Sequence, residues 1–247
     1  MTSFKYIYGI IPGSHEITLP VVGIDGAQVY TIFASGLSAV ISTIEDKAVD
    51  PTRKNLQAHL AVQTRLMGEF TLLPAAFGMV ADSDEDIKHV LQENHSLFES
   101  EIKKVYGKVE AAVQVMWNRE AVLAELDRVD PEFSRLRKEL ARVSPDEARG
   151  LMVQIGKKVE ELSSRWQNRY GSAIHHELKT ASEDAVLHSI AAPQCILNAS
   201  YLVDKRKERE FSDKMSALGA QHAGKLEFKY TPNLPPYSFV ELRIQGR

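Results

Sequence analysis

The longest regularly spaced apolar pattern in this chain of 247 residues runs from residue 148 to residue 188. Apolar and small residues recur there at every third or fourth position. The positions are Ala148, Met152, Ile155, Val159, Leu162, Trp166, Tyr170, Ile174, Leu178, Ala181, Ala185 and His188. This spacing predicts one long helix, or two helices broken near Gly171, with an apolar seam along a sheet or a partner helix. We favour the protein's own sheet, because strands are predicted on both sides of the segment.

The second half of the chain predicts a ferredoxin-like domain. Residues 109–117 alternate apolar and polar side chains, as in a strand, and residues 195–203 and 226–230 also read as strands. A helix is predicted from Phe211 to His222, and residues 118–150, broken by prolines, read as a helical insertion. Strands and helices in this order fit the split β-α-β arrangement.

The first half predicts a small mixed sheet with helices. Residues 4–11, 29–33 and 37–44 read as strands, and residues 72–80 as a loop with a short strand. A helix after Pro51 is predicted to bury an apolar side. Its members are Leu56, Leu60, Leu66, Met67 and Phe70. A second helix begins at the acidic residues 82–86 and stops near Gly107. The fold class is therefore α+β, with two domains at residues 1–107 and 108–247.

The composition excludes some partners and locations. The formal net charge is −3, so no strong basic field is available to bind nucleic acid. No apolar run is long enough for a membrane-spanning helix, and the opening residues do not resemble a secretory signal. Cys195 is the one cysteine, which is typical of a reducing compartment. We therefore expect a cytoplasmic protein that binds neither nucleic acid nor membranes.

A search for reactive groups predicts no catalytic, cofactor-binding or metal-binding residues, and no cofactor. The phosphate-binding loop and the G-x-S-x-G nucleophile motif are both missing from the sequence. Cys195 lies in a predicted strand, where a small buried side chain is the commoner role. A metal-assisted enzyme remains as an alternative around four residues, although Thr180 stands where a second helical ligand would be needed. These residues are His175, His176, Asp184 and His188.

The closing run holds the candidate partner-binding residues, which are Pro235, Pro236, Tyr237 and Phe239. The prolines favour an extended backbone, so the two rings would stand on a stiff chain that loses little entropy on binding. The alternative is a strap that lays both rings on the domain's own core.

The same run, Pro235-Pro236-Tyr237-Ser238-Phe239-Val240, resembles a signature near the C-terminus of the gas vesicle protein F/L family. Further similar stretches lie at residues 6–10, 37–42, 59–60, 73–74, 77–78, 110–117 and 198–203. The resemblance therefore spans the whole chain. Asn233-Leu234 departs from it, because many relatives have Gly and Trp before the paired prolines.

The resemblance implies a non-enzymatic role in building gas vesicles, as an assembly factor or a minor wall protein. It implies two α+β domains, the second ferredoxin-like, and binding to the hydrophobic major shell protein, with other accessory proteins as further partners. It also allows a place on the gas-facing side of the vesicle wall. A cytoplasmic scaffold that binds only other accessory proteins is the alternative. The oligomeric state, the stoichiometry and the domain that contacts the shell protein stay open.

Overall fold

The computed structural model describes residues 3–190 and 192–241, in which the chain divides into two compact units. Unit 1 contains the chain up to Glu110 together with the closing segment from Pro232 onward, and unit 2 contains Ala111–Thr231. The predicted domains instead place the closing segment with the second half. Its side chains hydrogen-bond to residues of unit 1, as described below. Within the described ranges, no helix is long and apolar enough to cross a membrane.

Unit 1 is built on a mostly antiparallel sheet in the order β2-β3-β4-β1-β5, with β6 also pairing with β1. The strands are β1 (Phe4–Pro12), β2 (Thr18–Val22), β3 (Gln28–Ala34), β4 (Leu37–Ile44), β5 (Leu73–Pro74) and β6 (Val80–Ala81). The predicted strands correspond to β1, β3 and β4, whereas β2 was not predicted. β2 contains Pro20, which is tolerated because β2 lies at the sheet edge.

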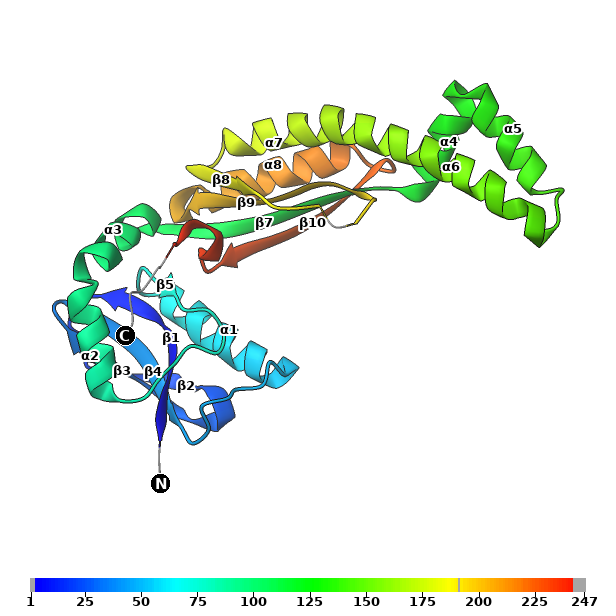
Figure 1. Cartoon of the computed structure of the whole chain (residues 1–247). Coiled ribbons are helices and arrows are strands. Elements are labelled where there is room, and N and C mark those ends of the chain that lie inside the picture. The colour runs from blue at the N-terminus through cyan, green and yellow to red at the C-terminus, as the bar shows by residue number, and fades with distance from the viewer. Residues whose placement is uncertain (1–2, 191, 242–247) are drawn as a thin grey trace. The chain divides into compact units, whose positions relative to one another are not determined.

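Three helices cover this sheet (Figure 1). Helix α1 (Arg53–Met67) packs on one face, and α2 (Asp84–Glu93) and α3 (His95–Val105) pack on the other. Alternate residues of β1 face the two layers, because successive strand side chains point to opposite sides. Tyr6 thus bonds to His59 of α1, whereas Lys5 pairs with Asp84 of α2.

Glycine at position 9 allows β1 and β5 to approach closely. A Cβ atom added to Gly9 would lie 2.5 Å from the carbonyl oxygen of Leu73. The register between β1 and β4 also shifts at this point. A larger residue would therefore displace β5, which carries the chain toward Ala75 and the site described below.

Unit 2 is built on a four-stranded sheet in the order β10-β7-β9-β8. The strands are β7 (Lys108–Trp117), β8 (Asp184–Leu187), β9 (Cys195–Asp204) and β10 (Leu226–Leu234). The two β-α-β passages interleave, so β7 and β9 lie side by side in the centre, as the ferredoxin-like prediction requires. Helices α7 (Ser172–Lys179) and α8 (Glu208–Gln221) cover one face of this sheet (Figure 1).

The predicted long helix is present but shorter than its apolar pattern. Helix α6 (Pro145–Trp166) continues through a π-helical turn at Gln167–Gly171 into α7. The helix lies so close to the sheet at Gly171 that an added Cβ would be 2.4 Å from the carbonyl oxygen of Ile196. The prediction that Ala185 and His188 extend the seam is wrong, because Ala185 belongs to β8 and His188 follows that strand. Met152 was also predicted on the seam, but it is 53% exposed.

The helical insertion contains α4 (Arg119–Val129) and α5 (Pro131–Leu140), which pack against α6. Their buried side chains are Val122, Leu126, Phe133 and Leu136. Both helices begin at side-chain caps. Asn118 accepts hydrogen bonds from the first turn of α4, and Asp130 accepts them from the first turn of α5.

Candidate functional site

The closing segment turns sharply after β10. Pro235 and Pro236 are buried, and the chain then forms a 3-10 turn at Tyr237–Phe239. The amide of Tyr237 donates to the carbonyl of Pro235 at 2.7 Å, and the amide of Phe239 donates to that of Pro236 at 3.1 Å. The predicted extended path therefore ends at the paired prolines. The turn brings Tyr237 and Ser238 to residues of unit 1.

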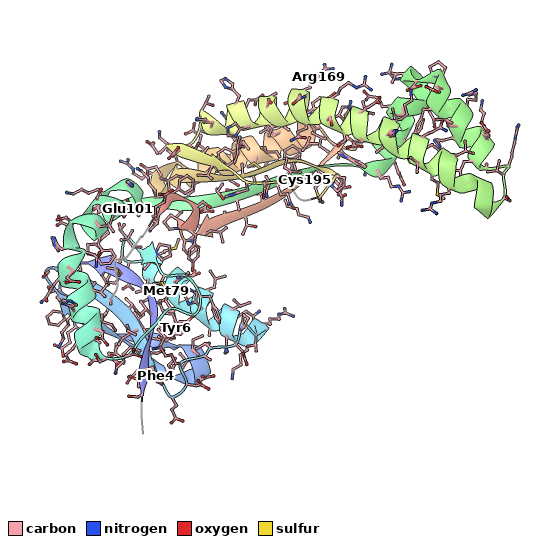
Figure 2. The ribbon with its side chains drawn as sticks, viewed as in Figure 1. Phe4, Tyr6, Met79, Glu101, Arg169 and Cys195 are labelled. Atoms are coloured by element: carbon pink, nitrogen blue, oxygen red, sulfur yellow. The ribbon has the colours of Figure 1, made fainter. Side chains whose placement is uncertain are left out.

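Two buried carboxylates hold the turn in place. The amide of Ser238 donates to Glu110 Oε2 and its hydroxyl donates to Oε1, both at 2.8 Å. The amide of Glu241 donates to Glu101 Oε2 at 3.2 Å, while Lys104 pairs with the other oxygen of Glu101 (labelled in Figure 2). Hydrogen bonds to charged acceptors are stronger than those between neutral groups. The backbone of the segment is therefore fixed on both sides of Phe239.

The hydroxyl of Tyr237 enters a buried polar network beneath α1. It donates to Gln63 Oε1 at 2.5 Å and lies 3.1 Å from His59 Nε2. Gln63 Nε2 in turn donates to the carbonyl oxygens of Tyr8 and Ala75, at 2.8 and 3.1 Å. The network thus joins β1, α1 and the segment after β5 to the closing turn.

The partners of His59 define its protonation. Its Nε2 lies 3.2 Å from the carbonyl oxygen of Ala75, which can only accept, so Nε2 carries the proton. Nδ1 then accepts from the hydroxyl of Tyr6 (labelled in Figure 2) at 2.9 Å. Burial lowers the pKa of His59, in keeping with a neutral ring, and burial raises the pKa of Tyr6 to about 12. The network is a set of neutral groups whose hydrogen bonds are mutually consistent.

Helix α1 buries Leu66 and Met67 as predicted, but not the whole of the predicted side. Its buried residues are His59, Val62, Gln63, Leu66 and Met67. Leu56 and Leu60, predicted to be buried, are instead 45% and 42% exposed. They form the row next to His59 and Gln63, because residues three and four apart are neighbours on a helix.

We use the name α1–Tyr237 surface for three exposed side chains: Leu56 and Leu60 of α1, and Tyr237, whose hydroxyl donates to Gln63 of the same helix. Tyr237 is 41% exposed even though its hydroxyl is bonded inside. Among the four predicted partner-binding residues, Pro235 and Pro236 are buried and Phe239 is half-buried. Sequence reasoning missed Leu56 and Leu60. His59 and Gln63 lie on the same side of α1 as Val62 and Leu66. This spacing could have shown that the polar pair is buried and that Leu56 and Leu60 lie beside it.

Two histidines of the alternative metal site have other partners. His175 Nδ1 lies 2.9 Å from the hydroxyl of Tyr201, and His188 Nε2 lies 2.8 Å from Ser200 Oγ. Within residues 3–190 and 192–241, no group of three His, Cys, Asp or Glu side chains could hold a metal ion. Burial raises the pKa of the Cys195 thiol (Figure 2), which favours the unreactive protonated form.

Known proteins resemble this chain along nearly its whole length. The family described as "Gas vesicle synthesis protein GvpL/GvpF" matches residues 4–241. Gas vesicle protein F from Dolichospermum flosaquae is 25% identical over 242 residues, which cover 96% of this chain and 97% of the relative. Gas vesicle protein F1 from Halobacterium salinarum is 27% identical, with 99% of this chain and 96% of the relative covered.

The fold has a solved counterpart. The crystal structure of the gas vesicle protein GvpF from Anabaena sp. PCC7120 superposes with a TM-score of 0.79 at 24% identity, covering 97% of this chain and 99% of the other. The two-sheet α+β fold is therefore that of proteins that serve gas vesicle formation. The chain belongs to the GvpL/GvpF family of gas vesicle synthesis proteins, which supports a role in gas vesicle assembly.

Proposed function

We propose that the protein is a non-enzymatic assembly factor or minor wall protein that binds the hydrophobic major shell protein of the gas vesicle through the α1–Tyr237 surface. The observation that carries this proposal is the anchoring of Tyr237. Its hydroxyl is bonded to Gln63 and lies against His59, while its ring stays 41% exposed. A ring held in this way loses little conformational freedom when a partner covers it.

The surface suits an apolar partner. Leu56 and Leu60 stand one helical turn apart, and a partner that covers them gains about 1 kcal/mol from each, since both are roughly half exposed. Arg53, Lys54 and Arg65 are exposed on the same helix and keep it polar beside the leucines. A subunit with a large apolar surface risks aggregation before assembly, and a rigid apolar patch on a polar helix would shield it.

Strand addition is less well supported as the binding mode. Three of the strands at the sheet edges contain a proline, which cannot donate a backbone hydrogen bond: Pro20, Pro74 and Pro232. The remaining edge strands, β6 and β8, have two and four residues, and the carboxylate of Asp184 accepts from the amide of Ala185 in β8. Docking on a helix face is therefore favoured over pairing with an edge.

Co-purification with the major shell protein tests the proposal. We expect a chain with Leu56→Ser and Leu60→Ser to lose at least about tenfold in retained shell protein, which corresponds to the burial of two leucines. Leu187→Ser is the matched control, because Leu187 is an equally apolar exposed residue in unit 2. Shell protein retained equally by all three chains would refute the surface. If only other accessory proteins are retained, the protein is a scaffold.

The location within the vesicle is also part of the proposal. We place the protein in the cytoplasm during assembly and on the gas-facing side of the finished wall, as its family relationship suggests. Immunodetection on purified vesicles, intact and after collapse, distinguishes the two faces of the wall. A signal that appears only after collapse supports the inner surface. A signal on intact vesicles would place the protein outside, and no signal in either sample would make it a helper that leaves before completion.

A further inference from the structure

Helix α6 carries a second seam that its own unit does not cover. Arg149, Val153, Gly156 and Glu160 are all exposed, and their separations of four, three and four residues match the spacing of a coiled-coil seam. The other side of α6 packs on α4 and α5. Val153 is 56% exposed and the adjacent Met152 is 53% exposed. Two large apolar side chains therefore lie in solvent on a helix whose core-facing side is already filled.

Helix α6 contains two glycines that close packing within the chain does not require. Gly150 and Gly156 both lie inside α6, and nothing comes within 4 Å of a Cβ added at either position. Glycine is a poor helix former, so an uncrowded helical position favours alanine. At Gly156, on the seam, the missing side chain instead leaves a flat place where a second helix can approach.

The order of the seam is complementary to itself. The seam has a charged residue at each end, Arg149 and Glu160, and these two charges are opposite in sign. Val153 and Gly156 lie between them. A second α6 lying antiparallel about a two-fold axis between Val153 and Gly156 would bring each valine onto the glycine of the other copy. The same axis brings Arg149 of one copy to Glu160 of the other, twice. Neither charge takes part in an ion pair with the other described residues.

An open groove continues the seam. It has a volume of about 760 Å³ and is lined by Asp130, Lys157, Glu160, Glu161, Ser164 and Arg165. Three of these side chains are acidic and two are basic, and Lys158 pairs with Asp130 at the groove wall. The antiparallel arrangement lays Arg149 and Met152 of the second copy along this groove. Arg149 of one copy thus meets Glu160 of the other beside a groove of mixed charge.

We propose that a second copy of this chain docks antiparallel along α6, forming a two-fold dimer through the seam Arg149, Val153, Gly156 and Glu160. The proposal is independent of shell protein binding, which uses α1 and the closing segment of unit 1. One pair of helices buries less surface than a standard stable interface, so the dimer dissociates in the micromolar range, on the order of 10–100 µM.

Sedimentation velocity of the full-length protein over a range of about 2–500 µM tests this, since the range brackets the expected dissociation constant. We expect reversible, concentration-dependent dimers. Val153→Lys should weaken the dimer by at least about tenfold, because it places one lysine from each copy in the apolar contact between the two helices. Leu187→Lys, an exposed apolar position outside the seam, is the matched control and should leave the dissociation constant unchanged.

Charge reversal tests the pairing itself. Arg149→Glu and Glu160→Arg should each weaken the dimer by about tenfold, since each places like charges opposite one another. The double variant restores opposite charges across the two-fold axis and should regain most of the affinity. A parallel arrangement or a different surface would not produce this rescue.

The two glycines supply a further contrast. Both Gly150→Ala and Gly156→Ala should raise the thermal midpoint at low concentration, because both sites have room and alanine favours the helix. Only Gly156→Ala should also weaken the dimer, since its methyl group occupies the place of the incoming valine. A monomer at every concentration, or equal behaviour of the two alanine variants, would overturn the proposal.

Discussion

Helices α1 and α6 differ in the side chains that they bury, because α1 buries polar residues that the described part of α6 does not. The buried side of α1 carries His59 and Gln63, and its exposed side carries Leu56 and Leu60. The core side of α6 carries apolar residues such as Leu162 and Trp166, both fully covered. Periodicity identifies Leu162 and Trp166 on α6, and it also identifies Leu66 and Met67 on α1. It does not identify the buried His59 and Gln63. A polar side chain can be buried wherever the fold supplies every hydrogen bond that it needs.

The largest effect should come from the apolar side of α6. Trp166→Ala should destabilise unit 2 by about 3–5 kcal/mol, because it opens a large cavity. It also removes the ring over which Lys225 Nζ lies, 4.5 Å from the ring centroid. Hydrogen exchange of β9 peptides in unit 2 reports this stability directly. Arg165→Ala, on the exposed side of the same turn, should change exchange little.

The polar side of α1 should be the next most sensitive. Gln63→Leu keeps the volume but removes three hydrogen bonds: two that the amide donates to the carbonyls of Tyr8 and Ala75, and one that it accepts from the hydroxyl of Tyr237. We expect unit 1 to lose about 2–3 kcal/mol, at about 1 kcal/mol for each buried hydrogen bond. Denaturant unfolding followed by exchange of β1 peptides measures it. Gln57→Leu, exposed on the same helix, is the control, and equal losses in both variants would contradict the network.

These two helices also show which features of the fold can be predicted from local sequence pattern. The strand β8 was missed, because Ala185 also fits the helical spacing. The strands β7, β9 and β10 and the buried Cys195 follow from local pattern, because their apolar residues face one continuous core. The burial of His59 and Gln63 in α1 does not. Their partners come from β1, from Ala75 and from Tyr237, which is far away in sequence, and no local pattern brings these groups together. The placement of the closing segment with unit 1 depends on the same distant contacts, chiefly Ser238 with Glu110.

A smaller effect isolates the anchor of the closing segment. Tyr237→Phe removes the hydroxyl that donates to Gln63 but keeps the ring, so unit 1 should lose about 1 kcal/mol. Retention of the major shell protein should change little, because the exposed ring is preserved. Tyr237→Ala removes both features and should reduce retention as well. Loss of retention in Tyr237→Phe without loss of stability would show that the hydroxyl itself contacts the partner.

The same network makes unit 1 sensitive to acid. Burial lowers the pKa of His59 below its ordinary value of 6.5. The unfolded chain therefore takes up a proton before the folded one, so the stability from the neutral ring is complete above about pH 6.5 and is lost as the pH falls through the folded pKa. We expect the protection of α1 amides, relative to their intrinsic exchange rate at each pH, to be lower at about pH 5.5 than at pH 7.5. His89→Gln, at an exposed site, should keep that dependence, and His59→Gln should flatten it.

The smallest change in stability is expected at the exposed leucines, where the contrast with Gln63 is sharpest. Leu56→Ser and Leu60→Ser remove apolar side chains from solvent, so each should alter the stability of unit 1 by no more than about 0.5 kcal/mol. If the apolar row were the true packing side, the same substitutions would cost several times more. A pair of variants that unfolds no more easily than the parent chain, yet retains less shell protein, would separate binding from folding on a single helix. Thermal unfolding and co-purification on the same preparations decide between these outcomes.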